Sequence, residues 1–586
     1  MNGDDGAIHV LDTRTINQIA AGEVVERPAS VVKELVENAI DAGAHLIRVE
    51  VNSDRRHITG IRVTDDGIGM GRGDAVLAFK EHATSKIRAI DDLDSVLSLG
   101  FRGEALPSIA SVAEVALVTR PRGGDVIAGT RVRIRGGAAP EVSETGAPEG
   151  TSVEVHDLFY NTPARSKFLK SLHTELAHIS GVIERTALSR PDIAFRLIHN
   201  GRERIATHPA TDLKETVTEL FGASTAEKLV PVSASSPAVR IGGYVSGPAL
   251  SRADPYQIFL SVNGRPISSF PIVRAIRDGY GTLLPKDRFP VAFLHLQIDG
   301  GRIDVNVHPT KKQVRFSNEA EICDIVREGV QTALNNGGQS GAAPFHGGPA
   351  TTAISHFIEK KREIPGFREP AAPFVLNDRR LRQSELPLAG AERNRLPEIT
   401  VIGQVDRTYI IGEAENRSLV IIDQHAAHER IVYEQVSERD SGGGRSQELI
   451  IPVLITVSPQ EDELMREALP ALSDEGFAVE EFGPVTYAVN AIPVILGKLE
   501  EAEVIRDLVS ALVREGPADP VGKREEIRRR VACRAAIKAG EDLSMEQMRR
   551  LIQQLSYTKQ PYTCPHGRPT IITYSTDELA GMFRRT

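Results

Sequence analysis

Residues 30–44 read SVVKELVENAIDAGA, and this stretch decides the fold of the N-terminal part of the chain. We predict an amphipathic helix here, with Ser30 as N-cap and Gly43 just beyond the end. Glu34, Asn38 and Asp41 are spaced i, i+4 and i+7, so they share one face. The opposite face is apolar and contains Val32, Leu35, Val36 and Ala39. The apolar face of such a helix covers a sheet, and its polar face stays open for chemistry.

Strands on either side of this helix complete the pattern. The segments 45–51 (HLIRVEV), 57–65 (HITGIRVTD) and 151–158 (TSVEVHDL) are rich in β-branched residues and alternate with amphipathic helical runs. This alternation is typical of an α/β sandwich with the helices on one face of the sheet. The chain is therefore assigned to the multidomain α/β (α+β) class.

The polar residues around the helix suit a nucleotide. A glutamate and an asparagine one turn apart can polarise a water and hold Mg²⁺ between phosphates. Taken alone, these two residues are better explained as part of a solvated helix face. In the turn Asp65-Asp66-Gly67-Ile68-Gly69, a carboxylate can accept from an exocyclic amine while glycines let the backbone approach a ring. Glycines at 100 and 103 precede a predicted helix, whose first amides favour phosphate.

The order of these motifs resembles that of the GHKL ATPases. The shared patterns are E-x-x-x-N at 34–38, D-x-G-x-G at 65–69, G-F-R-G-E-A-L at 100–106 and G-T at 150–151. Within that superfamily, the residues of these motifs and of four further stretches resemble the MutL family of mismatch repair proteins. The stretches that carry this are 20–28 (AAGEVVERP), 82–87 (HATSKI), 159–165 (FYNTPAR) and 304–311 (DVNVHPTK). The resemblance covers essentially the whole chain outside a linker.

The resemblance implies roles for individual residues. Glu34 would be the general base for the attacking water, and Asn38, with Asp41 beside it, would bind Mg²⁺. Asp65 would read adenine, with Gly67 and Gly69 in its turn and Thr151 behind it. The implied lid over the phosphates comprises Thr84, Lys86, Gly100, Phe101, Arg102 and Gly103. Lys311 would reach the γ-phosphate from a second domain, so that ATP sets the interdomain angle and closes an N-terminal dimer.

Composition limits the other readings. The chain has 586 residues, 41% of them hydrophobic and 25% charged, which predicts three or four domains. No apolar run is long enough for a bilayer and residues 1–10 lack an export pattern, so we expect a cytoplasmic protein, associated with the nucleoid during repair. The three cysteines, Cys323, Cys533 and Cys564, are too few for a disulfide framework and suit thiolates kept for metal.

We predict four parts. A GHKL (Bergerat) ATPase domain spans 1–210, and a ribosomal-S5-like α/β transducer domain spans 211–335. Residues 336–395 lack periodicity and predict a disordered linker. The remaining part, 396–586, is implied to be a C-terminal dimerisation and endonuclease domain, with an inserted regulatory subdomain at about 452–520.

A net charge of −9 argues against bulk electrostatic coating of nucleic acid, so any DNA contact must be local. The candidates are Arg120, Arg122, Arg131, Arg133, Arg135 and Arg265. Taken alone, each of these arginines is better explained as a solvated residue on a strand or turn. Residues 263–267 (NGRPI) match a family motif whose arginine contacts DNA. The resemblance therefore implies that Arg265 binds double-stranded, mismatch-containing DNA.

A second set of polar residues lies near the C-terminus. On the helix predicted after the strand SLVIID, His425 and Glu429 are spaced i, i+4, with Asp423 at the strand end. Cys564 and His566 point the same way if their segment is extended. Buried hydrophobic cysteines are the simpler alternative. With A-C-R at 532–534, C-P-H-G-R-P at 564–569 and F-R-R at 583–585, the set resembles the endonuclease-competent branch of the family.

That resemblance implies one or two divalent ions, Zn²⁺ with Mn²⁺ supporting nicking. The implied ligands are Asp423, His425, Glu429, Cys533, Cys564 and His566, and Glu434 is the outer acid of the motif, with a supporting role. Gln447, Leu449 and Pro452 look like a motif for docking on the replication sliding clamp, although an apolar run ending in proline is also an ordinary strand terminus.

The implied activity is an ATPase coupled to a metal-dependent nickase that acts as a homodimer after a MutS-type mismatch sensor. The alternative is an ATP-switched repair scaffold with a purely structural metal and no nicking of its own. Other GHKL relatives fit less well, because a sensor kinase needs a phosphoacceptor helix hairpin and a topoisomerase needs a tyrosine breakage domain.

Overall fold

The computed structural model describes most of the chain, with gaps. The described residues are 25–80, 83–84, 104–123, 128–285, 288–304, 315–337, 396–438, 446–496, 505, 507, 509–510, 520–538 and 540–585. By internal contacts the chain divides into two compact units. The first comprises 1–335, 446–492 and 501–527, and the second comprises 336–445, 493–500 and 528–586.

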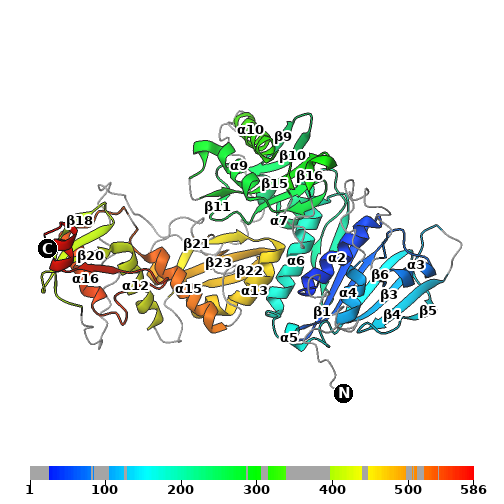
Figure 1. The fold of residues 1–586 in the computed structure, drawn as a ribbon, viewed down its shortest axis with the longest axis horizontal. Helices are drawn as coiled ribbons and strands as arrows, with labels where there is room; N and C mark the ends of the chain where they lie inside the picture. The colour runs from blue at the N-terminus through cyan, green and yellow to red at the C-terminus, as the bar shows by residue number, and fades with distance from the viewer. Residues whose placement is uncertain are drawn as a thin grey trace, which may run out of the picture. The chain divides into compact units, whose positions relative to one another are not determined.

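An eight-stranded sheet forms the N-terminal part of the first unit (Figure 1). Its order is β5-β4-β3-β6-β2-β1-β7-β8, in which β1 and β7 are parallel and the other neighbours are antiparallel. The strands are β1 (Leu46–Ser53), β2 (Ile58–Asp65), β3 (Glu114–Arg120), β4 (Gly129–Arg135), β5 (Glu141–Thr145), β6 (Gly150–His156), β7 (Ala194–His199) and β8 (Arg202–Ala206).

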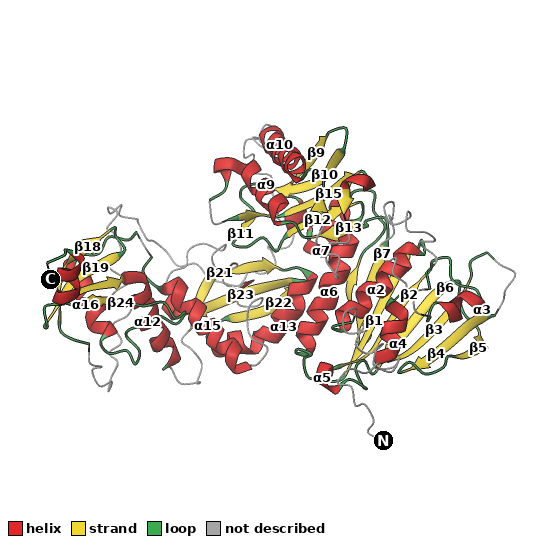
Figure 2. Cartoon of the chain, in the orientation of Figure 1, coloured by secondary structure: helices red, strands yellow, loops and turns green. Residues whose placement is uncertain are grey.

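Helices pack on this sheet and confirm the predicted α/β sandwich (Figure 2). They are α2 (Pro28–Asp41), α3 (Arg72–Leu77), α4 (Ala105–Val112), α5 (Pro163–Ser166) and α6 (Leu172–Ser189). Helix α2 contacts α4, α6 and the strands β1 and β2. The apolar residues of α2 that the sequence assigned to the core, Val32, Leu35, Val36 and Ala39, are all buried.

The start of α2 differs from the prediction. Ser30 lies inside the helix, which begins at Pro28 with Arg27 as N-cap and no capping bond from a side chain. Proline suits the first helical position because its fixed φ is helical and its missing N–H has no partner there anyway. The end is as predicted, because Gly43 follows the helix with φ +69°.

A five-stranded sheet of order β13-β12-β15-β10-β9 follows. Its strands are β9 (Leu229–Ser235), β10 (Val239–Ser246), β12 (Ile258–Val262), β13 (Arg265–Ile267) and β15 (Ala292–Ile298). Two short pairs accompany it: β11 (Ser251–Arg252) with β14 (Phe289–Pro290), and β16 (Ile303–Asp304) with β17 (Arg315–Phe316). The helices are α7 (Leu213–Phe221), α8 (Ala223–Ala226), α9 (Phe270–Tyr280) and α10 (Glu319–Gly337).

The apolar core crosses the predicted domain boundary at 211. Phe221 on α7 packs edge-on against Phe259 and Phe293 of the second sheet, and all three belong to the core cluster of the N-terminal sheet. Helix α10 ends at Gly337, two residues into the predicted linker. Residues 338–395 lie outside the described part of the chain, and description resumes at Leu396.

The segment predicted as an inserted subdomain contains a three-stranded sheet of order β21-β23-β22 with the helix α13. The elements are β21 (Ser446–Thr456), α13 (Pro459–Asp474), β22 (Ala478–Gly483) and β23 (Thr486–Pro493). By contacts, most of this segment belongs to the first unit.

The second unit is built on a four-stranded sheet of order β18-β19-β20-β24. Its elements are β18 (Ile399–Val405), β19 (Tyr409–Ala414), β20 (Leu419–Asp423), α12 (Gln424–Ser437), α16 (Met545–Leu555), β24 (Ile571–Tyr574) and α17 (Thr576–Met582). The C-terminal part of α15 (Pro520–Ala535) also belongs to it. Across all the described ranges, we find no helix with the length and apolarity needed to cross a membrane.

Candidate functional sites

The polar face of α2 is only partly covered. Glu34, Asn38 and Asp41 are half-buried, as the helical spacing predicted. Lys33 lies 3.5 Å from a carboxylate oxygen of Glu34 and 3.2 Å from one of Glu37. Burial works to lower the pKa of Lys33, but the two carboxylates outweigh it and the pKa is raised. The helix therefore presents a carboxylate with a fixed cationic neighbour.

Asp65 ends β2 and opens the glycine turn. Its Oδ1 accepts from the Gly67 N–H at 2.9 Å, and it stands opposite Thr151 on β6. Burial raises the pKa of Asp65 to about 6, against the lowering effect of hydrogen bonds from the backbone of Gly67 and Thr151. A half-buried carboxylate at a strand end is suited to recognising a polar group that replaces water.

Glycines bring backbone segments together around this carboxylate. At Gly69, with φ +66°, a Cβ would lie 2.0 Å from the carbonyl oxygen of Arg120. At Gly150, with φ +105°, a Cβ would lie 2.1 Å from the carbonyl oxygen of Asp65. The turn is tied to α2 through the bond from Ile68 N–H to Ala42 O at 3.0 Å. Both positions therefore need glycine for conformation and for space.

The neighbouring Asp66 has a different task. Its Oδ1 accepts from the backbone N–H groups of His45 at 2.7 Å and Leu46 at 2.9 Å, at the start of β1. Asp66 therefore anchors a loop, whereas Asp65 keeps its carboxylate at the sheet end. The sequence alone did not separate the two structurally.

The phosphate side of the predicted site is described only in part. Thr84 lies in a described pair of residues, and α4 begins at Ala105, directly after the glycine motif, as predicted. Lys86, Gly100, Phe101, Arg102, Gly103 and Lys311 lie outside the described residues.

Arg265 begins β13 and is half-buried. Burial lowers its pKa, and the carboxylates of Glu37, Asp41 and Glu34 act in the opposite direction. The carboxylates of α2 therefore interact electrostatically with Arg265. The sequence did not predict this proximity.

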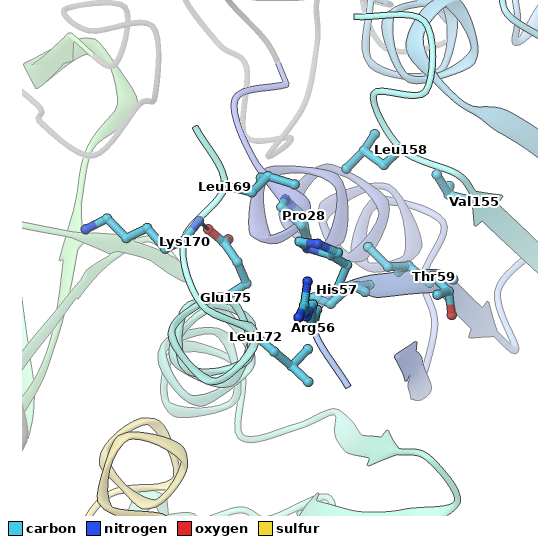
Figure 3. A pocket seen from close by; sticks show the side chains of 13 residues that line it. Pro28, Arg56, His57, Thr59, Val155, Leu158, Leu169, Lys170, Leu172 and Glu175 are labelled. Atoms are coloured by element: carbon cyan, nitrogen blue, oxygen red, sulfur yellow. Dashed lines mark hydrogen bonds between the residues drawn. The ribbon is translucent and has the colours of Figure 1, made fainter. Parts of the chain in front are cut away.

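A pocket lies at the other end of β2 from Asp65. Pro28 of α2, Arg56 and His57 of the β1–β2 turn, and Leu169 and Leu172 are among its lining residues (Figure 3). None of the predicted site residues lines it, so we do not assign it to the nucleotide.

The C-terminal unit brings five of the six predicted metal ligands together. His425, Glu429 and Cys533 form one set, and Glu429, Cys564 and His566 form another. Within each set the ligand atoms lie within 4.8 Å of one another, and Nδ1 of His566 is 2.9 Å from a Glu429 oxygen. Glu429 is therefore common to both sets, and its side chain is only 4% exposed.

The donor atoms fit a divalent ion. Nδ1 of His425 lies 2.8 Å from the carbonyl oxygen of Ile537, which can only accept, so Nδ1 carries the proton and Nε2 is left as a donor to metal. Burial raises the pKa of Cys533 to about 11, with the Glu429 carboxylate adding to the effect, and burial also raises the pKa of Cys564. Thiolate, imidazole and carboxylate are the ligands that Zn²⁺ takes in proteins, so an ion that binds here would displace the thiol protons.

Two details differ from the sequence predictions. Asp423 belongs to neither set, and its Oδ1 instead caps α12 by accepting from the Ala426 N–H at 2.9 Å. The 564–568 segment is not extended. The Cys564 N–H bonds the Arg568 carbonyl at 2.8 Å, and Gly567 adopts φ +82°. This turn, rather than strand alternation, presents Cys564 and His566 to Glu429.

Further polar residues of the same helix were missed as site residues. Gln424, His428 and Arg430 are buried within the motif that contains His425 and Glu429. The signal available in the sequence is that polar residues occupy every side of this helix at 424, 425 and 428–430, so that some of them must be buried against the strand.

The predicted clamp motif lies on the edge strand β21. Gln447 and Leu449 are half-buried, while Ile450 and Ile451 are fully or largely exposed. The strand continues to Thr456, so Pro452 does not end it. The simpler interpretation, an ordinary strand terminus, is therefore wrong.

Three protein families match successive parts of the chain. "Histidine kinase-, DNA gyrase B-, and HSP90-like ATPase" matches residues 26–133. "DNA mismatch repair protein, C-terminal domain" matches 217–335, and "MutL C terminal dimerisation domain" matches 402–543. The first range contains Glu34, Asn38 and Asp65, the second contains Arg265, and the third contains His425, Glu429 and Cys533.

Whole-length relatives agree with this order. The DNA mismatch repair protein MutL of Methanoculleus marisnigri is 51% identical over 99% of both chains. That of Methanocorpusculum labreanum is 44% identical, over 99% of this chain and 100% of its own. The solved Aquifex aeolicus MutL ATPase domain complexed with ADP is 28% identical over 47% of this chain and 93% of its own, with a TM-score of 0.35. From the match over full length, the chain belongs to the MutL family of DNA mismatch repair proteins.

Proposed function

We propose that this chain is an ATP-operated mismatch repair endonuclease, in which nucleotide binding at α2 controls nicking by a metal site on α12. One observation carries the nicking part: Glu429 is shared by two ligand sets drawn from three segments distant in sequence. A purely structural zinc needs four closed ligands, whereas a shared carboxylate suits a site with room for a second ion or a substrate oxygen.

At the nucleotide end, the proposed roles follow the family motifs. Glu34 activates the attacking water, and Asn38, with Asp41 nearby, holds Mg²⁺. Asp65 reads the exocyclic amine of adenine, supported by Thr151. The half-burial of all five residues and the elevated pKa of Asp65 support a site that excludes part of the solvent.

The remaining proposed ATP contacts come from the lid and the second domain. The lid is proposed to contain Thr84, Lys86, Gly100, Phe101, Arg102 and Gly103. We propose that Lys311 touches the γ-phosphate, so that ATP and ADP favour different domain arrangements.

At the metal end, the proposed ligands are His425, Glu429, Cys533, Cys564 and His566. Bound Zn²⁺ or Mn²⁺ would supply Lewis acidity and a hydroxide at neutral pH. Asp423 keeps its proposed catalytic role, with its Oδ1 accepting from the Ala426 N–H as the cap of the helix. Glu429, shared by both ligand sets, holds the two half-sites together.

The nicking proposal is tested with supercoiled circular DNA, Mn²⁺ and the full chain. Wild type should produce relaxed circles, and both Asp423→Asn and Glu429→Gln should not. Glu438→Gln is the matched control, because Glu438 is the C-cap residue of the same helix and its carboxylate lies 3.2 Å from the exposed ammonium of Lys559. If wild type yields no relaxed circles while zinc is bound, the alternative holds and the chain is an ATP-switched scaffold with a structural metal.

We propose a homodimer held by the C-terminal unit. The dimerisation-domain match covers 402–543, and the outer face of the four-stranded sheet exposes apolar side chains. Ile402 is 62% exposed and Ile572 is 47% exposed, and Ile572 stands opposite Ile421 in the sheet. Light scattering of the full chain without nucleotide should give a dimer, and a monomer at all concentrations would contradict this.

The proposed partners follow from the repair role. They are mismatch-containing double-stranded DNA, a MutS-type sensor and the sliding clamp. Arg265 is the proposed DNA contact, and Gln447, Leu449 and Pro452 form the proposed clamp contact, which the exposed Ile450 and Ile451 support. A linker of roughly sixty residues has an r.m.s. reach of roughly 40 to 50 Å, which would let the N-terminal domains close around DNA.

A further inference from the structure

Helix α12 buries polar side chains that are not metal ligands. Gln424 is 0% exposed, His428 2%, Arg430 6% and Glu434 7%. Neither ligand set includes any of them. Burying such groups costs free energy unless they are hydrogen-bonded, so their partners indicate what they do.

The residues at the start of the helix hold the segment that follows Cys533. Gln424 Nε2 donates to the carbonyl oxygens of Lys538 at 3.2 Å and Glu541 at 3.1 Å. Nδ1 of His428 accepts from the Ile537 N–H at 2.8 Å, on the residue whose carbonyl binds His425. The helix that contains Cys533 is thus followed by a loop, and side chains of α12 hold this loop by its backbone atoms.

Two residues further along the helix, Arg430 and Glu434, hold the segment that precedes Cys564. The two carboxylate oxygens of Glu434 accept from the N–H groups of Lys559 at 2.6 Å and Gln560 at 3.2 Å. Arg430 Nε donates to the Thr563 carbonyl at 2.6 Å, and its Nη1 is 3.7 Å from Glu434. Both oxygens of Glu434 therefore accept from backbone amides, and Glu434 belongs to neither ligand set.

We propose that Glu434 is a positioning residue of the metal site. Together with Arg430 it fixes residues 559–563, so that Cys564 and His566 reach Glu429 before any ion binds. The inference rests on the proposed function only in that the site binds a divalent ion. Without Glu434, the free-energy cost of ordering this segment would reduce the free energy of metal binding. Loss of such supporting groups typically weakens metal affinity about 10- to 100-fold.

The decisive substitution is Glu434→Gln, which keeps size and shape. A glutamine has one accepting oxygen, and its NH₂ group would face an N–H donor of residue 559 or 560. Glu438→Gln is the control one turn on, because the Glu438 carboxylate pairs with the side-chain ammonium of Lys559, whereas the Glu434 carboxylate accepts from the Lys559 backbone amide. Glu429→Gln is the reference for loss of a true ligand.

Zinc affinity of the reduced full chain is measured by competition with a chromophoric chelator, and stoichiometry by elemental analysis. We expect Glu434→Gln to bind about 10- to 100-fold more weakly, with wild-type stoichiometry restored at high zinc. At saturation with Co²⁺, its thiolate-to-metal absorption band should match wild type, since the ligands are unchanged. Glu438→Gln should match wild type throughout.

Amide hydrogen exchange of the metal-free protein gives a readout that does not depend on metal. Residues 559 and 560 should be protected in wild type and exchange faster in Glu434→Gln. If Glu434→Gln does not fold, Arg430→Lys, which removes the bond to Thr563, should give the same weaker affinity.

Wild-type affinity in Glu434→Gln would overturn the inference and leave the metal site standing. A stoichiometry that high zinc does not restore would make Glu434 a ligand and also overturn it. Absence of zinc and cobalt binding in wild type would instead refute the proposed metal site, and this inference with it.

Discussion

The nucleotide end and the metal end of this chain are built by opposite means. Around Asp65 the geometry is set by backbone: Gly69 and Gly150 allow main-chain segments to approach where no side chain would fit. Around Glu429 the geometry is set by side chains: α12 holds two distant loops through buried Gln424, His428, Arg430 and Glu434. A site formed by close backbone segments is disrupted by substitutions that add atoms. A site held by buried side chains is disrupted by substitutions that remove their hydrogen-bonding groups.

The difference fits the ligand proposed for each site. A planar ring needs close approach and a carboxylate at a defined depth, which strand ends provide. A metal ion needs several donors converging from different segments, which one well-anchored helix can organise.

The largest expected effect is at the metal end. Glu429→Gln removes the carboxylate common to both ligand sets, so zinc affinity should fall by more than about 100-fold, beyond the range for merely supporting groups. ATP binding should stay unchanged, because the substitution lies in the other unit. Elemental analysis and nucleotide titration of one preparation check both halves. A parallel loss of ATP binding would break the comparison.

At the nucleotide end, Gly150→Ala tests the backbone argument. The new Cβ would meet the Asp65 carbonyl at 2.1 Å, and alanine resists φ +105°. Strain of about 1–3 kcal/mol should lower ATP affinity about 5- to 150-fold. Gly146→Ala is the matched control, since nothing lies within 4 Å of its Cβ position. Equal ATP affinity of the two variants would contradict the argument.

The protonation of Asp65 should make ATP binding depend on pH. Burial raises the pKa of Asp65 to about 6. We proposed that its ionised carboxylate accepts from adenine, and on that proposal ATP affinity should fall about tenfold per pH unit below this value. The nucleotide-free fold should conversely lose stability as pH rises from 3.8 toward 6, because the folded state binds the proton more tightly. Calorimetric titration from pH 5 to 7.5 measures the binding profile, and Asp65→Asn should flatten it.

The smallest expected change in basal activity is at β21. The double substitution Gln447→Ala, Leu449→Ala should leave nicking without clamp within about twofold of wild type, because β21 contains none of the proposed ligands and a surface change costs little. Stimulation by a loaded clamp should disappear. Glu448→Ala, on the opposite side of the strand, serves as control. Undiminished stimulation in the double variant would remove the docking proposal.

Much of the fold was predictable from residue patterns. The α2 face, the strands around it and the α/β class follow from apolar spacing, which the structure confirms. The start of α2 was misjudged because Ser30 is a good N-cap, whereas Pro28 fits the first turn without one.

The sites were less predictable where tertiary partners decide. Adjacent Asp65 and Asp66 accept from different backbone amides, which the sequence cannot assign. The turn at Gly567 and the capping role of Asp423 depend on local hydrogen bonds that spacing does not reveal. The anchoring by Glu434 requires a segment more than a hundred residues away, which no local pattern contains.

Pro452 has a consequence for solubility. Among the described strands β21 is the outer one of its sheet, and an outer strand that displays Ile450 and Ile451 could also recruit strands from other molecules. Proline has no N–H to offer such a strand, and so interrupts the ladder on which fibre-like stacking would grow. The same residue thus allows the strand to expose Ile450 and Ile451 while discouraging self-assembly into aggregates.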